Sequence, residues 1–157
     1  MKTMIAGLAA LAIALPALAH ADDADPIGDL LSNVAAKMKA MGASFGLKAT
    51  LYHGGGGMSA HDALGCRVVP MRTAAVDGVK VPRHSLLFIK ETVGMPLPDG
   101  SKHDGYWYAS DSGGAIHEGR IDLFTGQNAG SMKPLMPLNL ATLTVAIAGK
   151  FDGCPKS

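Results

Sequence analysis

Asp111 and Asp122 stand near the two ends of a stretch that runs from Trp107 to Phe124. The second aspartate lies in an alternating run of charged and apolar residues, namely Arg120, Ile121, Asp122 and Leu123. Successive side chains of a strand point to opposite faces, so the two apolar residues are predicted to enter a core. Asp122 is then predicted to point outward, into a groove.

A carboxyl group in that position suits proton transfer. Neighbouring carboxylates such as Asp111 and Asp122 raise one another's pKa, whereas the cation of Arg120 on the same face opposes this. The balance is typical of a general acid that stays protonated near neutral pH. Such a group can give its proton to the leaving group of a bond that breaks.

The stretch from Asp111 through Ser-Gly-Gly-Ala-Ile to Gly119-Arg-Ile-Asp122 resembles the signature of the 3D (Asp-Asp-Asp) domain. Upstream, Arg72-Thr-Ala-Ala-Val-Asp77 and the following Val-Pro are similar to the part of that signature that holds its first aspartate. Tyr52 and the histidine after it resemble the tyrosine-containing entry to the domain.

The resemblance spans about 50–126 and implies a mainly β fold, a small six-stranded double-psi β-barrel, here with an N-terminal helix after a cleaved signal peptide. It also implies kinship with membrane-bound lytic transglycosylase A and with secreted stationary-phase muralytic proteins. Those enzymes cleave the MurNAc–GlcNAc bond of peptidoglycan without water and leave a 1,6-anhydro ring. By position, Asp122 corresponds to the residue that is acid and then base, Asp111 to a supporting carboxylate, and Asp77 to the first aspartate.

Substrate contacts are expected from residues around these aspartates, namely Tyr108, Gly113, Gly114, His117 and Arg120. No cofactor or metal is expected, because the histidine spacings match no zinc template and no closely spaced cysteine pair is present. Aromatic rings at 106–108 are candidates for stacking on sugars, although alternation places Trp107 opposite both tyrosines.

Other interpretations stay open at this stage. Asp77 lies in a Val-Asp-Gly sequence, where a turn-forming aspartate is the commoner explanation. The usual Ile-Lys-Gly step of the family reads Ile-His-Glu-Gly at 116–119, which changes the loop. A non-catalytic barrel that binds or loosens cell-wall polysaccharide and a conventional glycoside hydrolase remain alternatives to the lytic enzyme.

The elements that must position these residues are one helix and several short strands. Asp25-Pro26 is a helix start, and the apolar stripe that follows predicts one buried face before Gly42 ends the helix. The predicted strands are 46–52, 66–69, 73–76, 86–89, 107–109, 120–124 and 143–148, and short strands with glycine-rich turns favour a closed barrel.

The chain begins with the pattern of a secretory signal peptide, in which Lys2 precedes an apolar run and cleavage follows Ala21. The predicted organisation is a signal peptide at 1–21, a helix and linker at 22–45, and the barrel at 46–157. No cysteine lies near the cleavage site to carry a lipid, so a periplasmic or secreted protein is expected, without stable membrane insertion.

Composition and cysteines complete the prediction. The chain has 14 Lys and Arg against 13 Asp and Glu, and loss of Lys2 leaves a net charge of about zero, which disfavours a nucleic-acid partner. Peptidoglycan glycan strands are the expected partner, and the sequence leaves the oligomeric state open. In an exported chain Cys66 and Cys154 favour an intramolecular disulfide, with free thiols or an intermolecular bond as alternatives.

Overall fold

The computed structural model describes residues 26–55, 60–117 and 119–156. The predicted signal peptide, its cleavage site and Asp25 lie outside these residues. The predicted helix is present as α1, Pro26–Met41, and Gly42 follows it with a positive φ of 84°. Glycine adopts this left-handed conformation without steric cost, which explains why the helix ends there.

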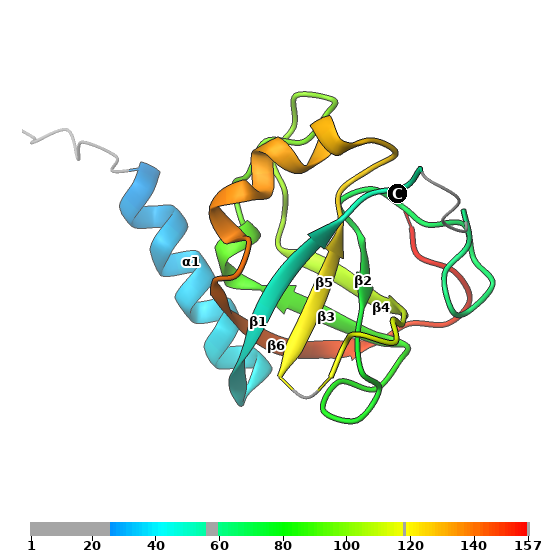
Figure 1. Ribbon diagram of the computed structural model, residues 1–157. Helices are drawn as coiled ribbons and strands as arrows, with labels where there is room; N and C mark the ends of the chain where they lie inside the picture. The colour runs from blue at the N-terminus through cyan, green and yellow to red at the C-terminus, as the bar shows by residue number, and fades with distance from the viewer. Residues whose placement is uncertain (1–25, 56–59, 118, 157) are drawn as a thin grey trace, which may run out of the picture.

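The prediction of a buried stripe along α1 is wrong for most of its length. Val34 is the one residue of the helix that is fully buried, whereas Ile27, Leu30 and Leu31 are exposed. The reason is the position of the helix, which lies against one side of the barrel rather than within its core (Figure 1). Lys37 holds its ammonium group over the rings of Phe88 and Tyr106 and so helps to attach α1 to the barrel.

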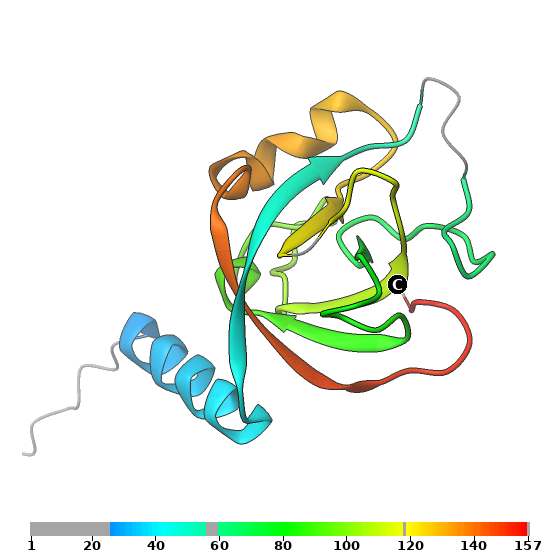
Figure 2. The same ribbon diagram turned by 60° about the horizontal axis from the view of Figure 1, so that its bottom comes forward.

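Six strands close into a barrel in the order β1-β5-β2-β4-β3-β6 (Figures 1 and 2). Their bounds are β1 Ser44–Tyr52, β2 Thr73–Ala75, β3 Ser85–Ile89, β4 Tyr106–Asp111, β5 Arg120–Phe124 and β6 Thr142–Lys150. Two 3₁₀ segments, η1 Lys90–Thr92 and η2 Ala129–Leu138, complete the described elements. The predicted mainly β, six-stranded barrel with an N-terminal helix is confirmed.

The pairing has an internal two-fold relation. β1 pairs with β5 and β2 pairs with β4, both in parallel, while β1–β6, β3–β4, β2–β5 and β3–β6 are antiparallel. Exchanging β1, β2 and β3 for β4, β5 and β6 reproduces the same set of pairs. This is the interlocked topology expected of a double-psi barrel, and it places the short β2 between β4 and β5.

The strand predicted at 66–69 is not formed. Its segment is a loop that makes one isolated bridge, between His61 and Arg67, and Asp62 folds it by accepting the backbone N–H groups of Leu64 and Cys66 through Oδ1. Cys66 forms the predicted disulfide with Cys154, with their Cα atoms 5.4 Å apart. The disulfide therefore joins this loop to the C-terminal end of the chain, and the loop is not part of the barrel sheet.

The core confirms the alternation predicted for β5, because Ile121 and Leu123 are both fully buried. Trp107 is fully buried as well and donates its indole N–H to Thr92 at 3.1 Å. Pairing a buried indole with a hydroxyl removes the cost of burying its polar group. Within the described residues, no helix has the length and apolar character needed to cross a bilayer.

Candidate functional site

The site is built from a row of residues that crosses four neighbouring strands. Thr50 of β1 pairs with Asp122 of β5, Asp122 pairs with Ala75 of β2, and Ala75 pairs with Asp111 of β4. Paired residues on adjacent strands share a face of the sheet. The small Ala75 side chain thus lies between two carboxyl groups that belong to different strands.

A β-bulge at Ser110 brings Asp111 onto this face. Alternation from Trp107 and Ala109, which are both buried, would turn Asp111 toward the core as well. The register of β2 against β4 shifts, however, so that Ala74 pairs with Ala109 while Ala75 pairs with Asp111. The extra residue reverses the direction of the following side chain, a common use of bulges near functional sites.

Asp111 accepts hydrogen bonds from several donors. Its Oδ2 accepts the Tyr52 hydroxyl at 2.7 Å, and its Oδ1 accepts the backbone N–H groups of Ala63 at 3.0 Å and Ser112 at 2.8 Å. Ala63 lies in the loop that Cys66 ties down, so the disulfide supports one of these donors.

Tyr52, at the end of β1, connects that strand to Asp111 of β4 through its hydroxyl. Its ring packs on Phe124 with centroids 5.2 Å apart, which fixes the direction of the hydroxyl. Burial raises the pKa of Tyr52 above its ordinary value, and the hydrogen bond and charge of Asp111 raise it further. Tyr52 therefore keeps its proton and acts as a hydrogen-bond donor.

Asp122 has a different environment. Burial raises the pKa of Asp122, and the negative charge of Asp111 adds to this, although hydrogen bonds from the Thr50 hydroxyl and the Leu123 N–H oppose the rise. Its Oδ1 is buried and has no hydrogen-bond partner among the described residues. A buried carboxylate oxygen without a donor favours the neutral acid, because the charge would be poorly solvated.

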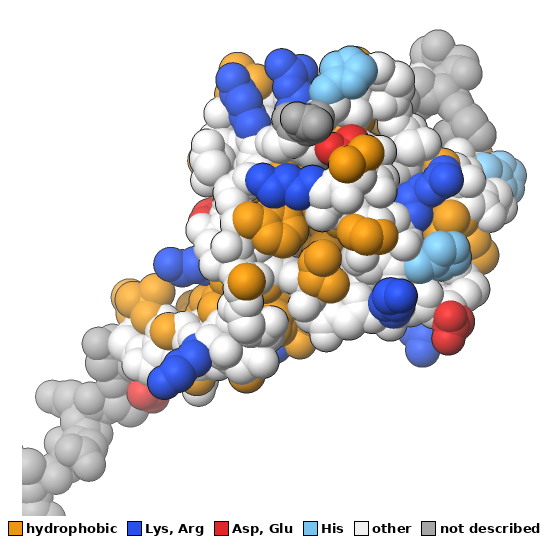
Figure 3. Space-filling model, turned by 90° about the horizontal axis from the view of Figure 1, so that it is seen from below, with side chains coloured by type: hydrophobic (Ala, Val, Ile, Leu, Met, Phe, Trp, Pro, Cys, Tyr) orange, Lys and Arg blue, Asp and Glu red, His pale blue; other side chains and the backbone are white. Residues whose placement is uncertain are grey.

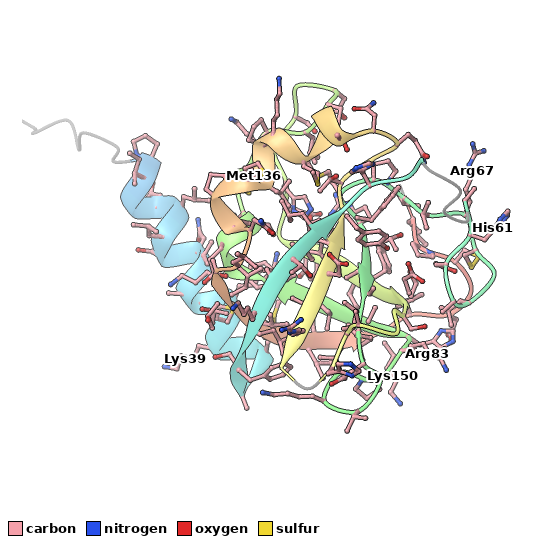
Figure 4. The ribbon with its side chains drawn as sticks, viewed as in Figure 1. Lys39, His61, Arg67, Arg83, Met136 and Lys150 are labelled. Atoms are coloured by element: carbon pink, nitrogen blue, oxygen red, sulfur yellow. A yellow bond between two sulfur atoms is a disulfide. The ribbon has the colours of Figure 1, made fainter. Side chains whose placement is uncertain are left out.

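A hollow of about 200 Å³ opens beside both aspartates, and its lining includes Tyr52, Ala75, Gly113, Gly114 and Ile116 as well. A second hollow of about 240 Å³ shares Asp111 and Ser112 with it and extends past His53 and His61. In Figure 4, His61 and Arg67 mark the outer edge of this side of the molecule. The two hollows adjoin at Tyr52, Asp111 and Ser112 and form one depression along the barrel wall.

Asp77 lies apart from the row. Its Oδ1 accepts the backbone N–H groups of Val79 at 3.0 Å and Lys80 at 3.2 Å, which is the turn-forming arrangement that its sequence context favours. It lines a larger hollow, of about 550 Å³, together with Arg83 and Ser112. Ser112 borders all three hollows, so Asp77 adjoins the site without lining the space beside Asp122.

The expected substrate contacts divide into two groups. Gly113 and Gly114 line the hollow with Asp122, and the space beside Gly114 is open, since a Cβ atom there would meet no heavy atom within 4 Å. His117 and Arg120 are exposed and lie outside the lining of that hollow. Arg120 is on the outer face of β5, as its alternation predicts, one step along the strand from the carboxyl row.

The aromatic residues at 106–108 do not form a free platform. Trp107 is in the core and stacks on His103, with ring centroids 5.0 Å apart. Tyr106 packs edge-on against Phe88. Tyr108 packs edge-on against Phe151, away from the lining of the hollow beside Asp122.

Three residues of the site could not be assigned a role from the sequence. Thr50 and Ala75 look like ordinary strand residues, and their roles depend on pairing between distant strands. Asp62 is buried at 6% exposure and lies on the Ala63 side of Asp111. The only signal in the sequence is the run of four glycines at 54–57 shortly before it, which predicts a loop without pointing to Asp62.

The described residues contain no group of three or more His, Cys, Asp or Glu side chains that is placed to hold a metal ion. His103 has a packing role. Its Nδ1 accepts the Gly105 N–H at 2.8 Å, and its Nε2 donates to the Met71 carbonyl at 2.7 Å. Burial lowers the pKa of His103, which keeps the ring neutral in this arrangement.

The two aspartates, the bulge and the glycines between them all fall within one family match. Residues 72–133 match the 3D domain. The matched part of the chain runs from just before β2 into η2, and it contains Asp77, Asp111 and Asp122. Tyr52 and Thr50 lie outside the matched 3D domain, on β1, which completes the barrel around it.

Solved structures similar to this chain include lytic transglycosylases. The chain is 19% identical to MltA of E. coli with bound chitohexaose, covering 58% of this chain and 28% of that one, with a TM-score of 0.42. It is 25% identical to LtgG of Burkholderia pseudomallei, covering 64% of this chain and 29% of that one, with a TM-score of 0.39. The chain thus spans less than a third of either protein. A comparison with curated proteins gave no match.

Proposed function

We propose that the protein cleaves the glycan strands of peptidoglycan as a lytic transglycosylase, with Asp122 as acid and then base. The observation that carries the proposal is the pairing of two unlike carboxyl groups across Ala75. Asp111 accepts three hydrogen bonds, whereas Asp122 has a buried oxygen without a donor and a raised pKa. Divergent environments of neighbouring acids are the usual sign of divided catalytic roles.

Asp122 starts as the neutral acid and gives its proton to the glycosidic oxygen as the bond from that oxygen to C1 breaks. The charge that develops on C1 and the ring oxygen is stabilised by the fixed negative charge of Asp111. The 6-hydroxyl of the same sugar then attacks C1, and the ionised Asp122 takes the proton of that hydroxyl. The new bond closes the 1,6-anhydro ring, so no water is consumed.

One acid is sufficient for this reaction. The environment of Asp111 supports a mechanism in which Asp122 is the only group that transfers a proton. A hydrolase of the inverting kind needs a second carboxylate that is free to activate water. Both oxygens of Asp111 are already acceptors for Tyr52, Ala63 and Ser112. Asp111 is therefore better suited to supply charge than to take a proton. Asp77, with its turn-forming role, supports the loop beside the site.

A location outside the cytoplasm is required for such a substrate, and the disulfide between Cys66 and Cys154 is consistent with one. The signal peptide remains a prediction from the sequence. The oligomeric state is open.

The test is to incubate purified sacculi with the wild-type protein and with Asp122→Asn, and to analyse the soluble products by mass spectrometry. Wild type should release fragments that end in anhydro-sugars, and the variant should lose activity by about 10²–10⁴-fold while it still binds the wall. Reducing ends in place of anhydro-sugars would make the protein a hydrolase. Wall binding without any released fragment would leave a non-catalytic binding barrel.

A further inference from the structure

Asp62 is a buried aspartate in the loop before β2, and it lies outside the matched 3D domain. Burying a carboxyl group costs free energy unless the group finds hydrogen-bond donors. Its Oδ1 accepts the backbone N–H groups of Leu64 at 3.0 Å and Cys66 at 2.8 Å. An aspartate that accepts the N–H two residues further on is a common turn former. Asp62 therefore shapes a turn over residues 62–66, which we call the Asp62 turn.

The hydrogen bonds of the Asp62 turn leave one backbone donor that points out of it. The N–H groups of Asp62 and Gly65 are donated to carbonyl groups within the turn, at 2.8 and 3.0 Å. Together with the two donors to the Asp62 carboxyl group, four of the five N–H groups are used inside the turn. The fifth, from Ala63, is donated to Oδ1 of Asp111 at 3.0 Å. The turn thus directs this one donor at the candidate site.

The outer side of the Asp62 turn is fixed separately. Cys66 is the last residue of the turn, and its disulfide holds it to the C-terminal end of the chain. His61 and Arg67, on either side of the turn, form a bridge and are exposed at the edge of the molecule in Figure 4. Figure 3, which views the molecule from below, shows basic and histidine side chains on the same right-hand side. The position of the turn is therefore fixed from outside, while its internal shape depends on the buried Asp62.

The Asp62 turn supplies a donor that Asp111 needs to hold one orientation. The terminal torsion of an aspartate is broad, so a single hydrogen bond does not fix the plane of its carboxyl group. Tyr52 holds Oδ2 from β1, and Ala63 holds Oδ1 from the loop, so the two oxygens are fixed by different segments. Burial is the main cause of the raised pKa of Tyr52, and the charge of Asp62 is one of the contributions that add to it. Asp62 is therefore within electrostatic reach of the same donor.

We propose that Asp62 is a positioning residue for the candidate site, because its turn presents the Ala63 N–H to Asp111 and so fixes the orientation of Asp111 beside Asp122. The inference rests on the proposed function, in which Asp111 stabilises the charge that develops on the sugar. Without the Ala63 donor, Asp111 still lines the hollow but is no longer held in the orientation that the transition state requires. The chemical step should then slow, while binding of the glycan is unchanged.

Four variants separate the aspartate from the donor that it positions. Asp62→Ala removes the acceptor that shapes the turn, and Asp62→Asn keeps an oxygen that can accept the same two N–H groups. Ala63→Pro deletes the donor and keeps Asp62, since proline lacks an N–H and suits the position after a turn-forming aspartate. Asp99→Ala is the matched control, because Asp99 shapes another turn by accepting the N–H and hydroxyl of Ser101. Asp99 lies outside the lining of the two hollows beside Asp111.

Kinetics on soluble glycan strands, with kcat and KM measured separately, test whether Asp62 acts through Ala63. Asp62→Ala and Ala63→Pro should each lower kcat by about tenfold, the size expected for one lost hydrogen bond, with KM unchanged. The double variant Asp62→Ala/Ala63→Pro should lose no more than either single variant, because both changes remove the same contact. Asp62→Asn should recover most of the kcat that Asp62→Ala loses, and Asp99→Ala should behave as wild type.

An amide spectrum of isotope-labelled protein tests the same contact without any activity. The Ala63 amide resonance should move in Asp111→Asn, which changes its acceptor, and also in Asp62→Ala. Once Asp62→Ala is present, adding Asp111→Asn should leave this resonance where it is. The indole N–H of Trp107, the one tryptophan of the chain, reports on the barrel core and should stay in place in every variant.

The possible failures are distinguishable. If Ala63→Pro keeps the wild-type kcat while Asp62→Ala loses it, or if the two losses add in the double variant, Asp62 only supports the fold of its loop and the inference is wrong. An Ala63 resonance that ignores Asp111→Asn in the otherwise wild-type protein overturns the inference whatever the activity. If wild type cleaves no glycan although the Ala63 resonance responds as expected, the proposed function fails, and the contact has no catalytic role to support.

Discussion

The end of β4 and the middle of β5 present the same side chain in two opposite environments. Asp111, at the end of β4, accepts three hydrogen bonds, one from the half-buried Tyr52 and two from the backbone. Asp122, in the middle of β5, has one buried oxygen with no donor among the described residues and a raised pKa caused first by burial. The difference teaches that backbone geometry, rather than residue type, decides how well each aspartate is supplied with hydrogen-bond donors.

The largest expected effect on this comparison comes from Asp111→Asn. The variant removes the negative charge that helps to raise the pKa of Asp122, so the acid should lose its proton at lower pH. Cleavage of sacculi should fall by about 10²-fold, a typical loss for one stabilising group in a site. In the pH–rate profile, the limb that reports loss of the acid's proton should move to lower pH. A profile that falls in height without moving would show that Asp111 does not act through the pKa of Asp122.

Tyr52→Phe should have a smaller effect, because it removes one of the three donors to Asp111 and keeps the ring that packs on Phe124. A hydrogen bond to a charged group contributes about 1.5–3 kcal/mol, so the free energy of unfolding should fall by about that amount and cleavage by about tenfold. Chemical denaturation and the sacculus assay measure the two effects.

The matched control for this change is Tyr108→Phe. The Tyr108 ring packs on Phe151, and its hydroxyl has no hydrogen bond among the described residues. Neither stability nor cleavage should change by more than the error of the assays. Equal losses in Tyr52→Phe and Tyr108→Phe would mean that the hydroxyl of Tyr52 does not hold Asp111.

The smallest effect concerns stability alone. The folded-state pKa of Asp122 lies above its unfolded value of 3.8, so ionising this group as the pH rises through the folded pKa costs stability. Asp122→Asn avoids the charge and should raise the free energy of unfolding at pH 7 by about 1 kcal/mol. This gain should shrink as the pH falls and disappear below the unfolded value, where the wild-type group is neutral in both states.

Denaturation curves of Asp122→Asn and Asp111→Asn across this pH range test the comparison directly. Asp111→Asn should be destabilised at pH 7, because its donors then meet a neutral acceptor. If both substitutions shift stability in the same direction at pH 7, the two aspartates do not occupy opposite environments.

Much of the fold follows from local patterns in the sequence. The bounds of β5 match the prediction residue for residue, because alternation over 120–124 has only one arrangement that buries Ile121 and Leu123. The start of α1 at Pro26 and its end before Gly42 also follow from backbone preferences of single residues. The apolar stripe along α1 is also a local pattern, and it predicts the helix correctly. Whether the stripe is buried, however, depends on which part of the barrel packs against the helix.

Sequence alone thus predicted the strand that carries Asp122 and the outward direction of that side chain, and it favoured the disulfide between Cys66 and Cys154 that the structure contains. It could not determine which residues surround the carboxyl group. Tertiary structure decided that Asp111 faces Asp122, because a bulge at Ser110 reverses the alternation and because β2 inserts Ala75 between the two strands. The physical reason is that strand pairing and burial in the closed barrel bring together residues that are far apart in the sequence. A local pattern of residue types does not specify which distant residues will meet.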